Sequence, residues 1–317
     1  MTRRELESFC LSELGSHLQE KEFVAVGVGA VFGLRLRDGR RVVVKLYRAG
    51  THSARLSEAL AVQRHLAERG FPAPLPLTGP IQTPGGLAVG ETLLDRGRPE
   101  DPHEPAIRRA MASALAELVA MCRPLGGFDE LTWKLNSAEP LWGTPHDDRF
   151  DFAATSIGAE WIDELAREAR GRLGSGRNVV SHTDWRAENM RFENGRVSAV
   201  YDWESLSRAP EPVHVAEAAH YFPSDFRVEG RTQIPTLEEA YAFVADYEAA
   251  RGVDLTADEL RAVRAALVDA MAYTARCEHS DALTDFGRRP PASPQSEPPR
   301  GSARAFLRMH GRELLEG

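Results

Sequence analysis

One polar loop between two apolar strands constrains this chain of 317 residues more than any other feature. The loop follows the pattern H-x-D-x-x-x-x-N and reads His182-Thr-Asp184-Trp-Arg186-Ala-Glu-Asn189. Short apolar runs at 179–181 and 197–201 predict the flanking strands, and Asp202 directly follows the second run. Strands on both sides would hold the oxygens of Asp184, Asn189 and Asp202 in fixed positions.

Phosphoryl transfer is the chemistry that needs this set of side chains. A carboxylate must receive the proton of the attacking hydroxyl, which predicts Asp184 as the catalytic base. The cations that bridge nucleotide phosphates are hard and prefer oxygen ligands, which predicts Asn189 and Asp202 as metal ligands. The alternative is a polar turn in which the Asp and Asn side chains cap the local backbone.

The loop resembles the catalytic and metal-binding loops of the aminoglycoside phosphotransferase family, relatives of choline kinases and protein kinases. That family has H-G-D-x-x-x-x-N followed by I-D-W-E or I-D-x-G, and the match here covers His182, Asp184, Asn189, Asp202, Trp203 and Glu204. The resemblance spans roughly residues 22–220. It implies an α+β, bilobal protein-kinase-like fold, ATP as phosphate donor with GTP as an alternative, and Mg²⁺. It also places Glu204 at the substrate site.

Two positions of the loop region need separate comment. Arg186 lies where the protein-kinase loop has its lysine, so it would reach either the transferring phosphate or an acidic neighbour in an ion pair. His214 lies where the family has an Asp that braces the catalytic loop. It is therefore open whether a side chain at this position braces the catalytic loop, although the chemistry itself is not affected.

The first part of the chain has features that resemble the nucleotide site of the same family. Lys45 ends the apolar strand Val42-Val43-Val44 and resembles the lysine that contacts the α- and β-phosphates. Glu58 lies at the edge of the apolar arc of the helix predicted at 53–69, where it resembles the acidic partner of that lysine.

The remaining nucleotide contacts are predicted from the backbone. Gly27 and Gly29 would let the chain approach the phosphates closely, although two glycines make a weak motif. The strand around Glu91 and Leu93 is predicted, by its position alone, to hold the adenine through its main chain.

Hydrophobic periodicity predicts a β-rich, nucleotide-binding lobe at 1–92 and a mainly helical lobe at 93–317 for catalysis and substrate binding. Asp38-Gly39 is a strong hairpin signal between two of the strands. We expect helices at 3–20, 53–69, 105–121, 156–173, 237–250, 256–280 and around 306–314, and strands at 23–28, 31–37, 41–47, 77–81 and 87–94.

Residues 123–155 form the candidate acceptor segment. It interleaves aromatic and polar side chains: Trp133, Trp142, Phe150 and Phe152 with His146, Asp147, Asp148 and Asp151. Asp147 and Asp148 are predicted to bind an amine-bearing or sugar-like acceptor through charge-assisted contacts, while the aromatic rings stack on it. The alternative is that the rings fill the core and the acids face water.

Composition excludes several classes of partner. The net charge of −8 argues against nucleic-acid binding, which needs a basic face. The sequence has no run of 18 apolar residues, so no membrane span is predicted. Its three cysteines are widely spaced and predict neither a disulfide framework nor a zinc site. We therefore expect a cytoplasmic protein that is a monomer or a homodimer. It would act on a hydroxyl group of a small molecule, and one option is that this molecule is cationic. The acceptor would be an antibiotic such as an aminoglycoside, or an amino-sugar or amino-alcohol metabolite.

The sequence also bears on two alternative functions. A protein kinase would have a long activation loop and an A-P-E motif, whereas Pro210-Glu211 comes only eight residues after Asp202. A catalytically silent kinase fold, acting as a binding or regulatory module, normally lacks the base, the metal Asp or the lysine. Asp184, Asp202 and Lys45 are all present here, which favours the enzyme.

Overall fold

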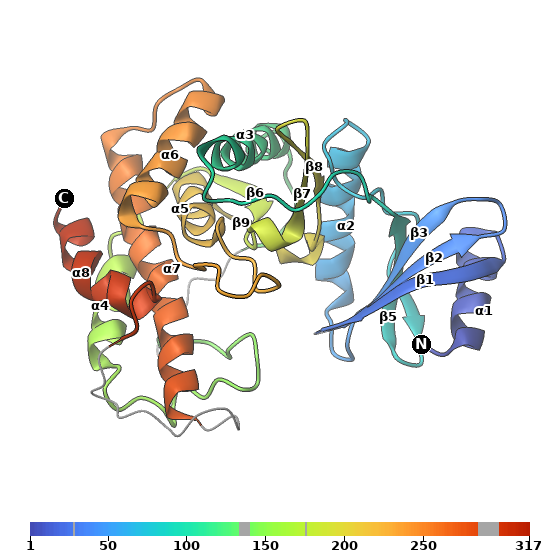
Figure 1. Cartoon of the computed structure of the whole chain (residues 1–317), viewed down its shortest axis with the longest axis horizontal. Coiled ribbons are helices and arrows are strands. Elements are labelled where there is room, and N and C mark those ends of the chain that lie inside the picture. Colours follow the sequence, from blue (N-terminus) through green and yellow to red (C-terminus); the bar gives the residue numbers. More distant parts are fainter. Residues whose placement is uncertain (28, 133–139, 175, 285–297) are drawn as a thin grey trace. The chain divides into compact units, whose positions relative to one another are not determined.

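The computed structural model describes residues 1–27, 29–132, 140–174, 176–284 and 298–317 (Figure 1). These residues form two compact units. The first unit combines Met1–Arg98, Pro124–Leu131 and Met190–Leu206, and the second combines Pro99–Arg123, Thr132–Asn189 and Ser207–Gly317. The division of the chain into lobes at residue 92 stays a prediction.

An antiparallel sheet forms the body of the first unit. Its strand order is β1-β2-β3-β5-β4, with β1 at Leu18–Val26, β2 at Ala30–Leu36, β3 at Arg41–Leu46, β4 at Ile81–Thr83 and β5 at Gly86–Thr92. Helix α1 (Arg3–Leu14) packs on one face of this sheet (Figure 1). Its buried Leu6 and Phe9 join Leu34 and Leu36 of β2 in one apolar core.

The two ends of this sheet differ from the sequence-based expectation. The first helix was expected to reach residue 20, but it ends at Leu14 because Gly15 takes up the left-handed conformation, with φ of 70°. The strand expected at 77–81 is found at Ile81–Thr83 instead. Pro76 precedes the expected strand and Pro80 lies within it, and neither has an N–H to donate to a neighbouring strand.

Further elements of the first unit follow the sheet in sequence. Helix α2 (Ser53–Ala67) buries Leu56, Val62 and Leu66. The hairpin of β7 (Met190–Glu193) and β8 (Arg196–Val200) leads to the 3₁₀ turn η2 (Trp203–Ser205). Trp203 is buried, and its ring packs edge-on against Phe71, with 5.8 Å between the ring centroids.

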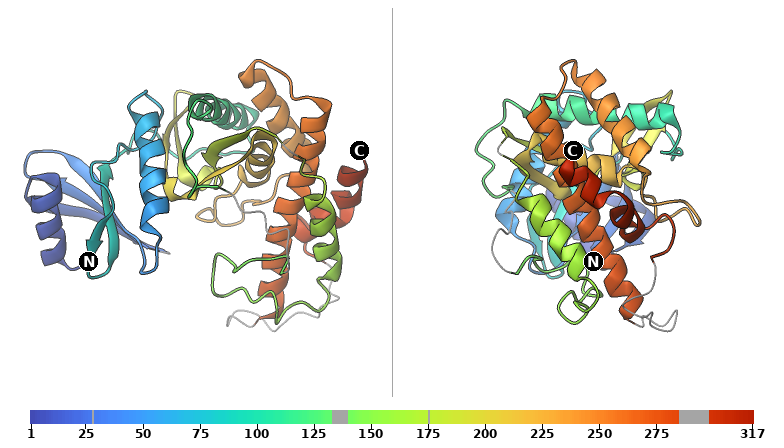
Figure 2. Two further views of the ribbon diagram at one scale, coloured as in Figure 1. Left: turned by 180° about the vertical axis from the view of Figure 1, so that it is seen from behind. Right: turned by 90° about the vertical axis from the view of Figure 1, so that its left-hand side faces the viewer.

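Helices dominate the second unit. They are α3 (Pro105–Cys122), α4 (Glu160–Arg170), α5 (Glu211–Tyr221), α6 (Leu237–Arg251), α7 (Ala257–Leu283) and α8 (Ala303–Glu316). Helices α4, α5 and α8 pack against the long helix α7 (Figure 2). A two-stranded sheet joins β6 (Asn178–His182) to β9 (Leu206–Pro210), and the 3₁₀ turn η1 (Ala187–Asn189) precedes β7. Among the described residues, no helix is both long and apolar enough to cross a membrane.

Helix α5 was not expected from the sequence. Nearly all of its residues are buried, so it has no polar face and gives no helical periodicity. Pro210 and Pro212 stand at its start, where proline is well tolerated because the first turn of a helix needs no N–H from it.

Candidate active site

The catalytic loop predicted from the sequence is held together by short-range hydrogen bonds in the second unit. The Asn189 side-chain N–H₂ donates to the Asp184 carboxylate at 2.7 Å and to the Asp184 carbonyl at 3.0 Å. The Asp184 backbone N–H donates to Nδ1 of His182 at 3.2 Å. Asn189 therefore fixes the carboxylate proposed as base, and His182 fixes the backbone of the same residue.

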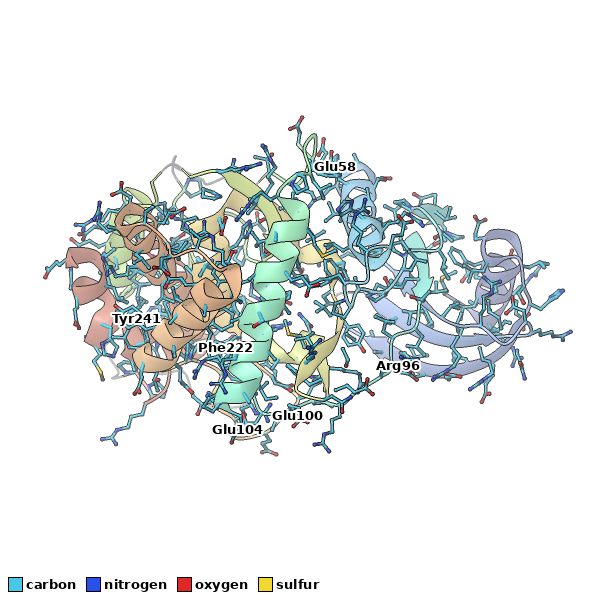
Figure 3. All side chains as sticks on the ribbon, turned by 90° about the horizontal axis from the view of Figure 1, so that it is seen from above. Glu58, Arg96, Glu100, Glu104, Phe222 and Tyr241 are labelled. Atoms are coloured by element: carbon cyan, nitrogen blue, oxygen red, sulfur yellow. The ribbon has the colours of Figure 1, made fainter. Side chains whose placement is uncertain are left out.

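Buried side chains anchor this loop to the rest of the second unit. Trp185 is fully buried, and its indole N–H donates to the carbonyl of Met111 in α3 at 3.2 Å. The Ala187 N–H donates to the carbonyl of Phe222 at 3.1 Å. Phe222 follows α5 and stacks on Phe243 of α6, with ring centroids 5.2 Å apart (Figure 3). The loop is thus attached to three helices, which limits its movement.

Arg186 forms ion pairs inside the loop. Its Nε lies 3.2 Å from a carboxylate oxygen of Asp184 and 3.9 Å from one of Glu188. The guanidinium also lies over the ring of Phe226, 5.6 Å from its centroid. Of the two expected contacts of Arg186, this structure contains the ion pair with an acidic neighbour. The contact with a transferring phosphate stays a prediction.

His214 connects helix α5 to the strand that leads into the loop. The side chain is fully buried, and its Nε2 lies 3.1 Å from the carbonyl oxygen of Val179 in β6. A carbonyl only accepts, so Nε2 carries the proton and donates. The position where the family has an Asp, which can only accept, therefore carries a histidine that donates to the strand leading into the loop.

Lys45 is a buried lysine of the first unit with two acidic partners. Its ammonium group is 3.4 Å from a carboxylate oxygen of Glu91 and 3.6 Å from one of Glu204. Burial alone would lower the pKa of Lys45, but Glu91 and Glu204 together raise that pKa well above its ordinary value. The lysine is therefore charged and ready to contact an anion.

The sheet register explains why Glu91 meets Lys45. Lys45 pairs with Val89 across β3 and β5, and Glu91 lies two residues further along β5 on the same face. Such diagonal neighbours are within reach of long side chains. Gln63 of α2 donates to the Glu91 carboxylate at 3.0 Å, which fixes its orientation.

The pairing of Lys45 with Glu58 predicted from the sequence is wrong in this structure. Glu58 projects from α2 (Figure 3), and its carboxylate accepts a hydrogen bond from the N–H of Leu131 at 3.2 Å. Glu91 occupies the position beside Lys45 because the strand register places it there, and helical spacing alone could not reveal this. Glu204 also contacts Lys45, and its contact with the substrate stays a prediction.

Asp202 has a backbone conformation that is uncommon for residues other than glycine. Its φ of 61° and ψ of 46° lie in the left-handed region, which only glycine and, less often, Asn and Asp adopt. The buried Trp203 beside it donates its indole N–H to the carbonyl of Val200 at 2.8 Å. Strained backbone of this kind clusters at functional sites, which agrees with the predicted role of Asp202.

The predicted metal ligands are chemically suited to a hard cation. The Asn189 amide uses its nitrogen to bind Asp184, so its oxygen keeps its lone pairs for a ligand. The Asp202 carboxylate is a second oxygen donor of the kind Mg²⁺ prefers. Asn189 belongs to the second unit and Asp202 to the first.

Hydrogen bonds and close packing fix the backbone at Gly27, Gly29 and Leu93, which were predicted to contact the nucleotide. A Cβ at Gly29 would lie 2.5 Å from the carbonyl oxygen of Leu46, so glycine is required there by the close approach of β3. Gly27 donates its N–H to the Gly29 carbonyl at 2.9 Å. The Leu93 N–H donates to the Arg41 carbonyl at 3.2 Å. The phosphate and adenine contacts of these residues stay predictions.

The 123–155 segment separates its aromatic rings from its acids. Trp142, Phe150 and Phe152 are buried, and Trp142 and Phe152 each pack on Tyr273 of α7, while Trp133 lies outside the described residues. Asp147 and Asp148 are exposed, and Asp147 pairs with Arg149 at 3.7 Å. The rings that the acceptor was predicted to stack on belong to the core of the second unit.

Two contributors to the site were missed in the sequence. They are Gln63 and the side chain of Glu91, which was considered only for its backbone. The signal that could have found Glu91 was the register of β3 against β5, because Lys45 and Glu91 share a face once Lys45 is paired with Val89. Gln63 gave no signal of its own.

The model of the phosphotransferase enzyme family matches residues 23–253. Similar solved structures include the amicoumacin kinase hAmiN with AMP-PNP and Ca²⁺ (TM-score 0.65, 11% identity, 99% of this chain and 96% of that chain covered). They also include a microcompartment-associated aminopropanol kinase (TM-score 0.60, 13% identity, 98% of each chain covered).

A thermostable aminoglycoside phosphotransferase in complex with ADP and hygromycin B is similar as well (TM-score 0.59, 15% identity, 98% of each chain covered). A search of curated proteins gave no match. The structural likenesses confirm the predicted α+β, protein-kinase-like fold. With a family model that covers residues 23–253, this chain belongs to the phosphotransferase enzyme family.

Proposed function

We propose that this protein is an ATP-dependent kinase that transfers the γ-phosphate to a hydroxyl group of a small molecule. The observation that carries the proposal is the catalytic loop, in which the Asp184 carboxylate is held by Asn189 in a member of the phosphotransferase family. The neighbouring folds include kinases of amicoumacin and aminopropanol and an aminoglycoside phosphotransferase, which supports a small-molecule acceptor.

Each polar side chain of the site has a distinct role in this proposal. Asp184 accepts the proton of the attacking hydroxyl, and Asn189 keeps that carboxylate oriented. Arg186 moves from its ion pair with Asp184 to the transferring phosphate, where its charge stabilises the transition state. Lys45 holds the α- and β-phosphates, and Glu91 keeps its ammonium group in place.

Asn189 and Asp202 would hold Mg²⁺, which bridges the phosphates and neutralises the charge that develops on them. Gly27 and Gly29 would approach the phosphates, and the strand at Glu91 and Leu93 would hold the adenine. Glu58 supports this region by binding the backbone at Leu131 rather than the lysine. We further propose a cytoplasmic enzyme, monomer or homodimer.

The decisive experiment measures ATP consumption over a panel of hydroxyl acceptors. The panel contains aminoglycosides, macrolides, amino-sugars and amino-alcohols, with the Asp184→Asn variant as the background control. Acceptor-dependent ADP formation, with a phosphorylated product seen by mass spectrometry, would support the proposal. Mg-ATP binding without transfer to any acceptor would favour the silent, regulatory alternative.

A further inference from the structure

The segment of residues 222–236, which connects α5 to α6 (Figure 1), contacts the catalytic loop through its main chain. The Ala187 N–H donates to the Phe222 carbonyl at 3.1 Å, and the Glu188 N–H donates to the Ser224 carbonyl at 3.1 Å. Both donors belong to the 3₁₀ turn η1. The 222–236 segment therefore supplies the acceptors that hold this turn.

Turn η1 carries one of the two side chains that order the active site. It ends at Asn189, whose amide donates to the Asp184 carboxylate at 2.7 Å. Two further contacts join the same regions: the Phe226 N–H donates to the Glu188 carboxylate at 3.4 Å, and the Phe226 ring lies 5.6 Å from the guanidinium of Arg186. A shift of the 222–236 segment would therefore shift the groups around the predicted base.

Gln233 closes the 222–236 segment on itself. The Ser224 hydroxyl donates to the Gln233 carbonyl at 2.9 Å. The Asp225 N–H donates to Oε1 of Gln233 at 2.7 Å, and Nε2 of Gln233 donates back to the Asp225 carbonyl at 3.2 Å. These three hydrogen bonds fix the backbone at the residue whose carbonyl accepts from Glu188.

The carboxylate of Asp225 is the buried charge of this segment. It is 1% exposed, and it accepts from the Arg227 backbone N–H at 3.2 Å, from Arg227 Nε at 2.9 Å and from Arg231 at 3.5 Å. Burial alone would raise the pKa of Asp225, but the hydrogen bonds and charges of Arg227 and Arg231 lower that pKa below its ordinary value. The carboxyl is therefore charged, and because a buried charge without its partners is costly, the backbone keeps the conformation that brings both arginines to it.

The other end of the segment is attached to the rest of the helical unit. Arg231 lies 3.9 Å from a carboxylate oxygen of Asp101. Nε2 of His103 lies 3.1 Å from the Thr232 carbonyl, which can only accept, and Nδ1 of the same ring lies 2.7 Å from the Glu239 carboxylate in α6. The segment is therefore held at both ends.

The residue at position 214, where the family has its bracing Asp, does not hold η1. Nε2 of His214 donates to Val179 in β6, and Nδ1 has no hydrogen-bond partner in the described part of the chain. The main-chain N–H groups of η1 are bonded to the 222–236 segment instead. The catalytic loop of this chain is therefore supported from a different place.

We propose that Asp225 is a positioning residue for the catalytic loop. Its carboxylate, together with Gln233, holds the 222–236 segment in the conformation whose carbonyls fix η1 and keep Asn189 against Asp184. This inference rests on the proposed kinase function and adds a source of order for its active site. A displacement of the reacting groups by about 1 Å can cost about 10²-fold in rate, so a loosened segment should lower kcat.

The first test compares Asp225→Asn with Asp246→Asn on the full-length protein, using the panel acceptor that the wild type phosphorylates fastest. Asp246 of α6 is the matched control because it is also a carboxylate paired with an arginine, Arg108 of α3 at 2.9 Å. We expect Asp225→Asn to lower kcat about 10–100-fold, and Asp246→Asn to change it less than about twofold. The KM for ATP should change less than about threefold, because Lys45 and Asp202 belong to the first unit. Thermal unfolding and the stoichiometry of Mg-ATP binding separate a slower enzyme from a smaller amount of folded protein.

The second test needs no acceptor and measures hydrogen exchange of the Ala187 and Glu188 amides in the nucleotide-free protein. Exchange should be about tenfold or more faster in Asp225→Asn, as for a lost hydrogen bond to a charged group, and unchanged in Asp246→Asn. Gln233→Met removes both side-chain hydrogen bonds to the Asp225 backbone but leaves the carboxylate with its arginines, and it should have the same effects on exchange and on kcat. This variant keeps the inference testable if Asp225→Asn does not fold.

Two results would overturn this inference. One is unchanged exchange at Ala187 and Glu188 in Gln233→Met and, where it folds, in Asp225→Asn. The other is faster exchange with unchanged kcat while Asp184→Asn abolishes transfer. The kinase proposal fails separately, if the wild-type protein with Mg-ATP bound phosphorylates no compound of the panel described above. In that case the exchange rates still decide whether Asp225 holds η1.

Discussion

The catalytic loop and the Lys45 cluster are held in two different ways. The loop is closed by partners close in sequence, since Asp184 is bound by Asn189 and by His182. Lys45 is held by Glu91 and Glu204, which are far from it in the chain, and Glu91 is oriented by Gln63. Local arrangements can be predicted from spacing, whereas distant partners become visible only when the strand register is known.

The largest expected effect comes from the catalytic loop. In Asp184→Asn, the new amide oxygen can still accept from Asn189, so the loop geometry is kept while the base is lost. We expect a loss of turnover of ~10²–10⁴-fold, with Mg-ATP affinity nearly intact. Steady-state kinetics measures the turnover, and calorimetry measures the Mg-ATP affinity. More than a tenth of wild-type turnover would show that Asp184 is not the base.

The second prediction tests which acid holds Lys45. Glu91→Gln removes a buried carboxylate beside the lysine and should lower kcat/KM about 10–100-fold, since Lys45 is then held by Glu204 alone. Glu58→Gln should change kcat/KM less than about threefold, because its partner is the backbone of Leu131.

A double-mutant cycle makes this comparison quantitative. Lys45→Ala and Glu91→Gln should be strongly non-additive, as residues of one functional unit are. Lys45→Ala and Glu58→Gln should be additive. The reverse pattern would restore Glu58 as the partner. Thermal unfolding of each variant separates a catalytic loss from a loss of folded protein.

The third prediction concerns the metal. Asp202→Asn is the suitable change, because Asn tolerates a positive φ better than Ala does. We expect Mg-ATP affinity to fall about tenfold or more by calorimetry, since one negatively charged oxygen ligand is lost. Glu193→Gln, an exposed change in the same hairpin, is the control. Equal affinity and Mg²⁺ dependence in wild type and Asp202→Asn would remove Asp202 from the metal site.

The sequence predicted most of the fold because its signals are local. Alternating strands, the Asp38-Gly39 turn and amphipathic helices such as α3 and α4 follow from periodicity and turn chemistry. Helix α5 was missed because it is buried nearly all round, and β9 because it pairs with β6 across a long insertion. The cavity lined by α4, α5, α7 and the loop was not predicted, because no single pattern brings these segments together.

The smallest effect should come from the exposed acids of the 123–155 segment. Asp147 and Asp148 lie in water, and Asp147 already pairs with Arg149, so exposed charges of this kind contribute little to binding. We expect the double change Asp147→Asn with Asp148→Asn to alter the acceptor KM less than about twofold at 0.15 M salt, where attraction is screened beyond about 8 Å. The acceptor KM, measured beside the KM for ATP, shows whether these acids bind the acceptor. If the double variant raised the acceptor KM several-fold and left the KM for ATP unchanged, the acceptor would bind at the segment predicted from the sequence.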